Sequence, residues 1–395
     1  MNADANVRAD YGRLYRGANG NVLLMSMRRR SDLVGYCGCY EFEDVIAQVT
    51  GADRFEVGTA NALELPRRAF KAARYLTGSR ALAWRLAPKP NPLKLDRNYE
   101  LFFPVFTHAH ELFALAAIPD WRRHCRVAAC YIAEMWLHLL PRYLLELLSE
   151  FDQVFVGVRS PIDAVTKIAG RRCTYLPPAA SVLDFSPLPD FPRRFIDVCS
   201  VGRRSAQTHQ ALIELARKRE IFYYYDTVAA SGVDLKQRTF RVQDAAEHRL
   251  LLANLLKRSR YYIANRALVN DPGFTRGREE ISSRFYEGAA SGTVMIGEPP
   301  ASDDFKSQFD WEDAIVRLPF NSPDIGGLIA QLDQDPARQA RIRRANFCNA
   351  ALRHDWLHRL RVVYEACGIA PTAGMGERQR QLEAAASQAA ASWPA

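Results

Sequence analysis

The segment at residues 278–297 constrains the fold more than any other part of the chain. Residues 281–291 have the composition of a short helix, Gly292 follows them, and residues 293–296 form an apolar run that ends at a second glycine. Glycine is the usual helix stop because it readily adopts a left-handed conformation. A short apolar run bounded by turn residues is typical of a strand buried in a parallel sheet. The segment therefore predicts a helix that leads directly into a buried parallel strand.

Two glutamates frame this helix. Glu279 lies at its N-terminal approach, and Glu287 lies inside it, eight residues later. The free backbone N–H groups of a helix start favour an anionic ligand such as a diphosphate, and a nearby carboxylate can accept hydrogen bonds from a ribose diol. Two glutamates at this spacing also occur by chance on a solvated helix face. Their order with the glycine stop and the strand indicates a site, in which Glu280 is the alternative to Glu279.

This order resembles the Glu-x7-Glu signature of the retaining group-1 glycosyltransferases, which have the GT-B fold. The run Arg284-Phe-Tyr-Glu287-Gly-Ala-Ala-Ser-Gly292 is more similar to the branch of CgeB-like bacterial glycosyltransferases. The resemblance covers roughly residues 150–365. It implies a hexosyl or related transferase that uses a nucleotide-diphosphate sugar as donor, retains the configuration of the sugar, and needs neither a metal nor a further cofactor.

Strands alternate with helices along most of the chain, which predicts an α/β protein with parallel sheets. The expected strands are residues 21–27, 99–106, 127–132, 153–158, 195–201, 221–225, 261–264, 293–296 and 314–318. A helix is expected over 137–148, and a proline cluster between 177 and 192 marks a linker. We therefore expect two Rossmann-like domains whose parallel sheets face each other across a cleft.

The expected domains follow from the linker and the resemblance. They are an N-terminal acceptor-side domain over 1–186, a C-terminal nucleotide-sugar-binding domain over 187–355, and a helical crossover and tail over 356–395. Beyond residue 374 the composition turns to Ala, Gln and Glu, which predicts a surface helix with a frayed end.

The donor-side candidates are carried over from the resemblance. Gly202 and Arg203 match a Gly-Arg pair that contacts the diphosphate in the family, where glycine allows close approach and arginine offers a two-pronged donor. A solvated strand-exit loop is an equally open interpretation of these residues. The family's lysine a few residues later is absent, and Arg204 or His209 are the candidates to replace it. The remaining candidates are Glu287 for the ribose, Arg284 in the same helix, and Asn265 after the strand at 261–264.

The catalytic candidates are Glu279, Glu134 and His108. Glu279 matches the family's first glutamate, near the transferred sugar, and Glu134 stands where many members carry a histidine. His108 and His110 follow a strand at its carboxyl end, where clefts form in parallel sheets. Two alternate histidines could bind a metal, but no third ligand is evident, so we expect no metal site.

The basic charge is concentrated. The chain has a net charge of +9, and between residues 67 and 97 nine Lys or Arg stand against Asp96 alone. Tyr75, Leu76, Leu82 and Trp84 are mixed among them. Such a mixture suits an interfacial helix or an anionic acceptor surface, and the alternative is a helical excursion whose apolar residues dock on the domain. No nucleic-acid motif accompanies the charge, so no nucleic-acid partner is expected.

The first twenty residues lack the apolar core of a secretory signal, and the eight cysteines are scattered. We therefore expect a cytoplasmic protein, with peripheral contact to the inner face of the membrane through residues 67–97 as an added option. The expected function is sugar transfer to a glycan, lipid-linked or protein acceptor. The open alternatives are a noncatalytic nucleotide-binding partner of the same fold, a nucleotide-sugar epimerase, and a basic nucleic-acid or membrane-surface module.

Overall fold

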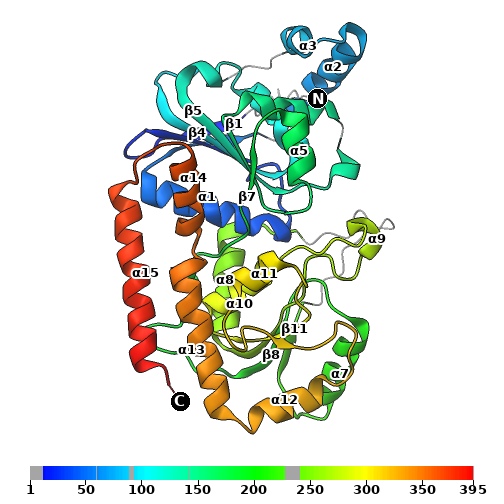
Figure 1. The fold of residues 1–395 in the computed structure, drawn as a ribbon, viewed down its shortest axis with the longest axis vertical. Coiled ribbons are helices and arrows are strands. Elements are labelled where there is room, and N and C mark those ends of the chain that lie inside the picture. The colour runs from blue at the N-terminus through cyan, green and yellow to red at the C-terminus, as the bar shows by residue number, and fades with distance from the viewer. Residues whose placement is uncertain (1–11, 59, 89–92, 141, 227–240, 395) are drawn as a thin grey trace, which may run out of the picture. The chain divides into compact units, whose positions relative to one another are not determined.

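The computed structural model describes residues 12–394 except 59, 89–92, 141 and 227–240. The chain forms two compact units, each built on its own sheet (Figure 1). Unit 1 comprises Met1–Asp32, Glu43–Leu176 and Val362–Gly374, and unit 2 comprises Leu33–Phe42, Pro177–Arg361 and Met375–Ala395. The expected class, α/β with two parallel-sheet domains, is confirmed.

The expected domain boundaries differ from this division. The chain passes from unit 1 to unit 2 after Leu176, before the expected break at residue 186. It also changes unit within two helices, α1 (Cys37–Thr50) and α14 (Trp356–Ala366). A proline cluster marks a linker in the sequence. A helix whose residues belong to two units carries no such local mark.

The sheet of unit 1 has the described strand order β1-β3-β2-β4-β5-β6-β7. All neighbouring pairs are parallel except β1 with β3. The strands are β1 (Gly12–Tyr15), β2 (Val22–Ser26), β3 (Asp53–Val57), β4 (Tyr99–His108), β5 (Cys125–Glu134), β6 (Gln153–Val156) and β7 (Cys173–Tyr175). The sequence predicted β2, β4, β5 and β6, which are continuous apolar runs, and missed the other three.

The helices of unit 1 include α2 (Ala60–Thr77), α3 (Arg80–Leu86), η2 (Ala109–Ala117), η3 (Trp121–His124) and α5 (Ile162–Ala169). The expected helix over 137–148 is wrong as a single element. The stretch contains three short helical pieces, η4 (Leu137–Leu139), α4 (Arg142–Leu145) and η5 (Glu146–Glu150). Pro141 stands among them in the sequence, and a proline has no N–H to continue a helical ladder.

The sheet of unit 2 has the described order β12-β11-β10-β8-β9, and all its pairs are parallel. Its strands are β8 (Ile196–Ser200), β9 (Tyr223–Tyr225), β10 (Ser259–Ile263), β11 (Val294–Gly297) and β12 (Val316–Arg317), all predicted from the sequence. The predicted helix before β11 is α10 (Ser283–Ala290), with Gly292 in the left-handed region at φ +57°. Glu287 lies inside α10 and Glu279 before it, as the sequence predicted.

The other described helices of unit 2 connect or flank these strands. They are η1 (Val34–Tyr36), α6 (Val182–Phe185), α7 (Ala206–Arg217), α8 (Ala245–Lys257), α9 (Pro272–Thr275), α11 (Asp303–Gln308), α12 (Ile325–Asp333) and α13 (Pro336–Arg353). Asp244 caps α8 by accepting from the backbone N–H groups of Ala246 and Glu247 at 2.7 and 3.0 Å, as predicted.

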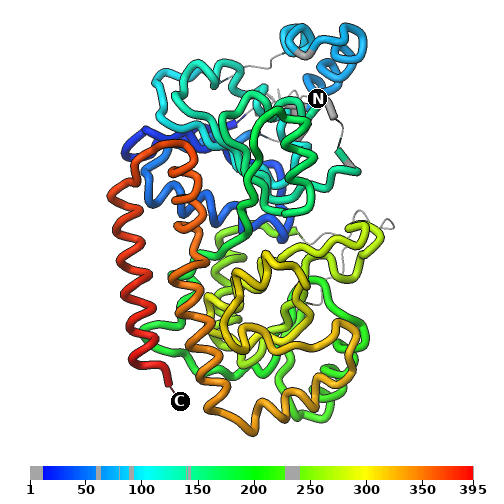
Figure 2. The backbone as a smooth tube through the Cα atoms, in the orientation of Figure 1, coloured from blue at the N-terminus to red at the C-terminus, as the bar shows by residue number. Residues whose placement is uncertain are grey.

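The C-terminal segment forms the predicted helix, but one face of the helix is buried and it continues to Ser392 instead of fraying. This helix, α15 (Ala373–Ser392), runs beside α13 (Figure 2) and is joined to it by a contact from Cys348 Sγ to the Ala386 carbonyl. Leu382 is fully buried, and the ring of Trp393 lies 5.9 Å from that of Phe347. Alanine-rich composition hides this packing because the small residues themselves make the contact. No described helix is both long and apolar enough to cross a membrane.

Candidate active site

A small pocket lies within unit 2, where the carboxyl ends of β8, β10 and β11 meet the start of α7. Ligands in open α/β sheets bind at this end because the strand exits converge there. The pocket is lined by Ser200, Arg204, Ser205, Thr208, His209, Leu212, Tyr223, Ile263, Asn265, Ile296, Gly297, Leu318, Pro319 and Phe320. The predicted residues Arg204, His209 and Asn265 are therefore brought together.

Gly202 lies at the exit of β8 in the left-handed region, with φ +73°. This positive φ favours glycine, and a Cβ here would lie 2.5 Å from Arg284 Nη2, so the tip of the arginine would have to shift. Arg284 also donates from Nε to the Val201 carbonyl at 3.2 Å. Two further predicted residues, one from the loop after β8 and one from α10, therefore meet next to Arg204.

The hydrogen-bond donors of this loop are paired with the carboxylate of Asp226. The Gly202 N–H donates to the two carboxylate oxygens of Asp226 at 3.2 and 3.0 Å. Arg204 donates from Nη1 to the same carboxylate at 3.0 Å and from Nη2 to the Asp226 carbonyl. The Arg204 guanidinium carbon lies 5.3 Å from the ring centre of Tyr225. The loop thus binds an oxyanion through one backbone amide and one guanidinium.

His209 lies on the first turns of α7, with Nδ1 2.9 Å from the Tyr223 hydroxyl. Burial and the nearby Arg204 lower the pKa of His209, which favours the neutral ring. Ser205 caps the same helix by accepting from the Thr208 N–H at 3.2 Å. Arg203 is exposed and donates to Asn270 Oδ1 at 3.4 Å, and it is not among the residues that line the pocket.

Glu279 lies on the loop before α10, in contact with the exit of β10. Its Oε1 is 3.3 Å from Arg266 Nε, and its Oε2 accepts from the Ala301 N–H at 2.8 Å. Arg266 also pairs with Glu298, whose N–H donates to Asn265 Oδ1 at 2.8 Å. The Glu279 side chain is 36% exposed, whereas Glu280 is buried. Of the two alternatives, Glu279 is the more accessible to a ligand.

Glu287 is buried in an ion network that does not line the pocket. Its Oε1 is 2.5 Å from Arg249 Nη1, and Arg249 Nη2 is 2.6 Å from Glu41 Oε2. Glu41 Oε1 accepts from the Ser181 N–H at 2.8 Å. Burial alone would lower the pKa of Arg249, but the two carboxylates raise it overall. The sequence did not indicate Arg249 or Glu41, because their pairing depends on segments far apart in the chain.

His108 and Glu134 lie side by side in unit 1, where they end the neighbouring strands β4 and β5 and are directly opposite in register. Burial and the neighbouring His110, whose ring centre is 5.6 Å away, lower the pKa of His108 to about 4. The described residues hold no group of three His, Cys, Asp or Glu arranged for a metal ion. The two residues expected on the acceptor side are thus neighbours at one sheet edge.

Glu111 was not predicted and is buried beside these residues. Its Oε2 accepts from the Thr107 N–H at 2.7 Å, and burial raises its pKa to about 7. Asp226 was missed as well, although an acidic residue directly after strand 221–225 is a signal that sequence reasoning could have used.

The comparisons with known proteins agree with this picture at a coarse level. Residues 210–365 match the model of a family described as glycosyl transferase-like. No curated protein matches the chain by sequence.

Three solved structures are similar to this chain in fold. An alpha,alpha-trehalose-phosphate synthase (UDP-forming) from Burkholderia vietnamiensis is 11% identical over 91% of this chain and 99% of that one, with a TM-score of 0.49. A sucrose-phosphate synthase from Thermosynechococcus elongatus is 14% identical over 93% and 100%, with a TM-score of 0.42. A glycosyltransferase from Rickettsia africae is 11% identical over 88% and 98%, with a TM-score of 0.47.

TM-scores of this size do not identify a reaction or a substrate. The family match covers residues 210–365, which include α10 with Glu287 and the strand β11 that follows α10. The protein is thus an α/β chain of two parallel-sheet domains, and its residues 210–365 match a family described as glycosyl transferase-like.

Proposed function

We propose that the protein is a GT-B glycosyltransferase that moves a sugar from a nucleotide-diphosphate donor to a glycan, lipid-linked or protein acceptor. The observation that carries the proposal is the oxyanion contact of Gly202 and Arg204 at the edge of the unit 2 pocket. By the resemblance of its Glu-x7-Glu segment, the enzyme belongs to the CgeB-like branch, retains the sugar configuration, and works without a metal.

The contact fits the chemistry that sugar transfer requires. A nucleoside diphosphate leaves with its negative charge, which preorganised N–H groups and guanidinium groups stabilise in a site without a metal. The Asp226 carboxylate now takes these donors. In our proposal a phosphate of the donor replaces that carboxylate, so Asp226 must move away when the donor binds.

The remaining residues receive roles in keeping with their places. Arg284 lies against the Gly202 loop and adds positive charge to the diphosphate site. Asn265 and His209 line the pocket. Glu279, which is paired with Arg266, is proposed to lie near the transferred sugar. In unit 1, His108 and Glu134 contact the acceptor. His108 is uncharged at neutral pH, because its pKa is about 4, and so offers a neutral ring.

Calorimetric titration with UDP, GDP, ADP, dTDP and CMP tests the donor site. We expect one nucleoside diphosphate to bind, and Arg204→Gln to weaken it by about tenfold to a hundredfold, the loss of one charge-assisted hydrogen bond. Arg217→Gln, at the far exposed end of α7, is the matched control and should bind normally. Binding of none of these nucleotides would contradict the proposal.

Incubation with the sugar conjugate of the nucleotide that binds then separates the alternatives. Release of nucleoside diphosphate that rises with an added acceptor supports transfer. A modified nucleotide sugar without release of the nucleotide indicates an epimerase, and binding without any turnover indicates a noncatalytic partner.

A further inference from the structure

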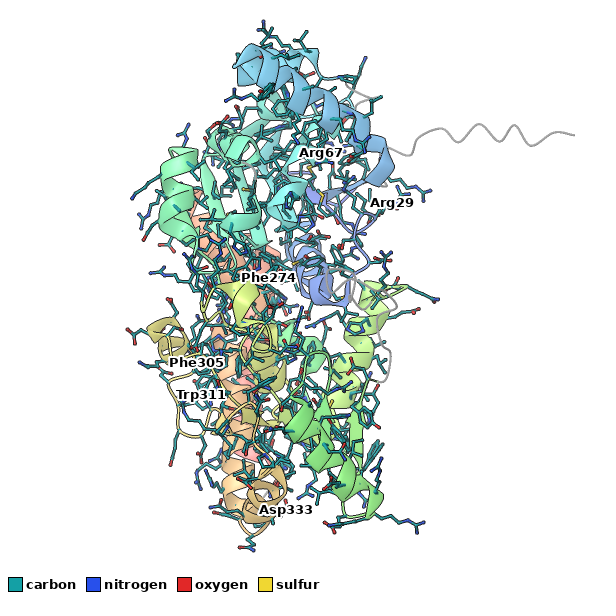
Figure 3. All side chains as sticks on the ribbon, turned by 90° about the vertical axis from the view of Figure 1, so that its right-hand side faces the viewer. Arg29, Arg67, Phe274, Phe305, Trp311 and Asp333 are labelled. Atoms are coloured by element: carbon teal, nitrogen blue, oxygen red, sulfur yellow. The ribbon has the colours of Figure 1, made fainter. Side chains whose placement is uncertain are left out.

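Large apolar side chains are exposed on α2 and α3, a pair of helices at one end of unit 1 (Figure 1). The exposed fractions are 69% for Leu65, 90% for Tyr75, 81% for Leu76, 45% for Leu82 and 60% for Leu86. Figure 3 shows side chains projecting outward from these helices, near the labelled Arg67. A helix face in contact with water would ordinarily be polar, so this exposure requires an explanation.

The opposite side of these two helices packs on the rest of unit 1 through apolar residues, as the helical-excursion alternative predicted. Phe70 and Ala83 are fully buried, and the ring centre of Trp84 lies 5.5 Å from that of Phe70 and 5.6 Å from that of Phe113. The docking of apolar residues on the domain therefore accounts for Phe70 and Trp84. It leaves the outward-facing leucines and Tyr75 unexplained.

Positive charge lies on the same exposed side. Lys71 and Arg85 are exposed, and the Arg68 side chain is 75% exposed. Helical spacing places Leu65, Arg68, Leu76 and the neighbouring Tyr75 on one side of α2, because residues three, four, seven and eleven apart share a face. Arg67 and Arg68 both donate to Glu64, at 2.8 and 2.9 Å. The face is therefore apolar and positively charged at once.

We propose that this face, the α2–α3 surface, binds to an anionic membrane. It consists of Leu65, Arg68, Lys71, Tyr75, Leu76, Leu82, Arg85 and Leu86. The leucines enter the boundary of the acyl chains, Tyr75 sits at the headgroup level, and the basic side chains reach the lipid phosphates. Charge complementarity selects anionic lipid as the occupant. The contact is independent of the proposed sugar transfer.

Sedimentation of the full chain with lipid vesicles tests the α2–α3 surface. We expect binding to phosphatidylcholine vesicles that contain about one third phosphatidylglycerol, weaker binding to pure phosphatidylcholine, and a loss of binding as salt rises. Two variants, Tyr75→Ser with Leu76→Ser and Arg68→Gln with Lys71→Gln, should each bind at least about tenfold less. Thermal unfolding should be unchanged, because these side chains are exposed.

The matched control is Leu250→Ser with Leu251→Ser, which removes exposed leucines from α8 in unit 2 and should leave vesicle binding intact. Wild-type protein that ignores anionic vesicles, or variants that bind like wild type, would overturn the proposal. So would a wild-type dimer that the Tyr75/Leu76 variant converts to a monomer without any effect of lipid, since the face would then bind a second copy. Nucleotide titration of the same variants keeps this outcome separate from that of the donor site.

Discussion

At the scale of single residues, Asp226 is the most informative side chain of the donor site. It holds the Gly202 amide and Arg204, the groups proposed to bind a diphosphate. Asp226→Asn removes a competing negative charge while keeping the side chain's shape, so we expect a nucleoside diphosphate to bind about tenfold more tightly. Calorimetry measures this, with the exposed Asp190→Asn as control. Weaker binding in the variant would mean that Asp226 instead positions Arg204 for the ligand.

Glu287 allows a ribose ligand to be distinguished from a purely structural ion pair. Glu287→Ala should lower the free energy of unfolding by about 3 kcal/mol, because it leaves the buried Arg249 with one carboxylate fewer. Glu287→Gln keeps the shape. If Glu287 binds ribose, this variant weakens a nucleoside diphosphate but not inorganic diphosphate, which has no ribose. Equal affinities of wild type and the glutamine variant for both ligands would assign Glu287 to folding alone.

Glu111 predicts a pH dependence of stability. Burial raises its pKa from 4.5 to about 7, so between these values the folded chain binds more protons than the unfolded chain. Stability therefore falls as pH rises through this window, by at most about 3 kcal/mol from this residue. Glu111→Gln should make the loss of stability between about pH 5 and pH 7 smaller, as urea unfolding at several pH values would show. An unchanged pH dependence in this variant would contradict the assignment.

At the level of secondary-structure elements, the sequence predicts those strands that form continuous apolar runs. The strands β4 and β11 were found because most of their residues are apolar and buried, and β10 was found from its apolar second half, Tyr261–Ile263. β3 was missed because it begins with Asp53, a fully buried carboxylate that accepts from Arg16 and from the Tyr99 hydroxyl, each at 2.9 Å. Such a strand looks polar until its partners are known.

The same limit applies to the site. Gly202 and Arg204 were indicated by the resemblance to the family's diphosphate loop, and Asn265 by its place after a recognisable strand, because strand exits meet at one edge of a parallel sheet. Asp226 directly follows a predicted strand and could have been identified in the same way as Asn265, but Arg249 could not. The significance of Arg249 lies in its contact with Glu287, which is distant in sequence.

The helix α15 should contribute strongly to the stability of unit 2. Arg378 lies on it, buried, and donates to both carboxylate oxygens of the fully buried Asp355 at 2.8 Å. We expect Arg378→Ala to lower the free energy of unfolding by about 3 kcal/mol, because an unpaired carboxylate remains inside the protein. Denaturant unfolding measures it, with the exposed Gln381→Ala on the same helix as control. A surface helix with a frayed end would predict no difference between the two variants.

At the scale of the whole molecule, the proposed activities are divided between the two units. Unit 2 holds the oxyanion contact and the pocket, and most of the residues matched by the glycosyl transferase-like family lie in it. Unit 1 holds His108 and Glu134 at one sheet edge, and the α2–α3 surface that we propose for membrane contact. The proposed donor site thus consists of contacts within a single unit.

A crystal structure with the nucleoside diphosphate that binds most tightly is the most direct test of the donor site. We predict that phosphate oxygens lie within hydrogen-bond distance of the Gly202 amide and the Arg204 guanidinium, with the Asp226 carboxylate displaced from both. A diphosphate bound elsewhere, while Asp226 keeps its present contacts, would contradict it.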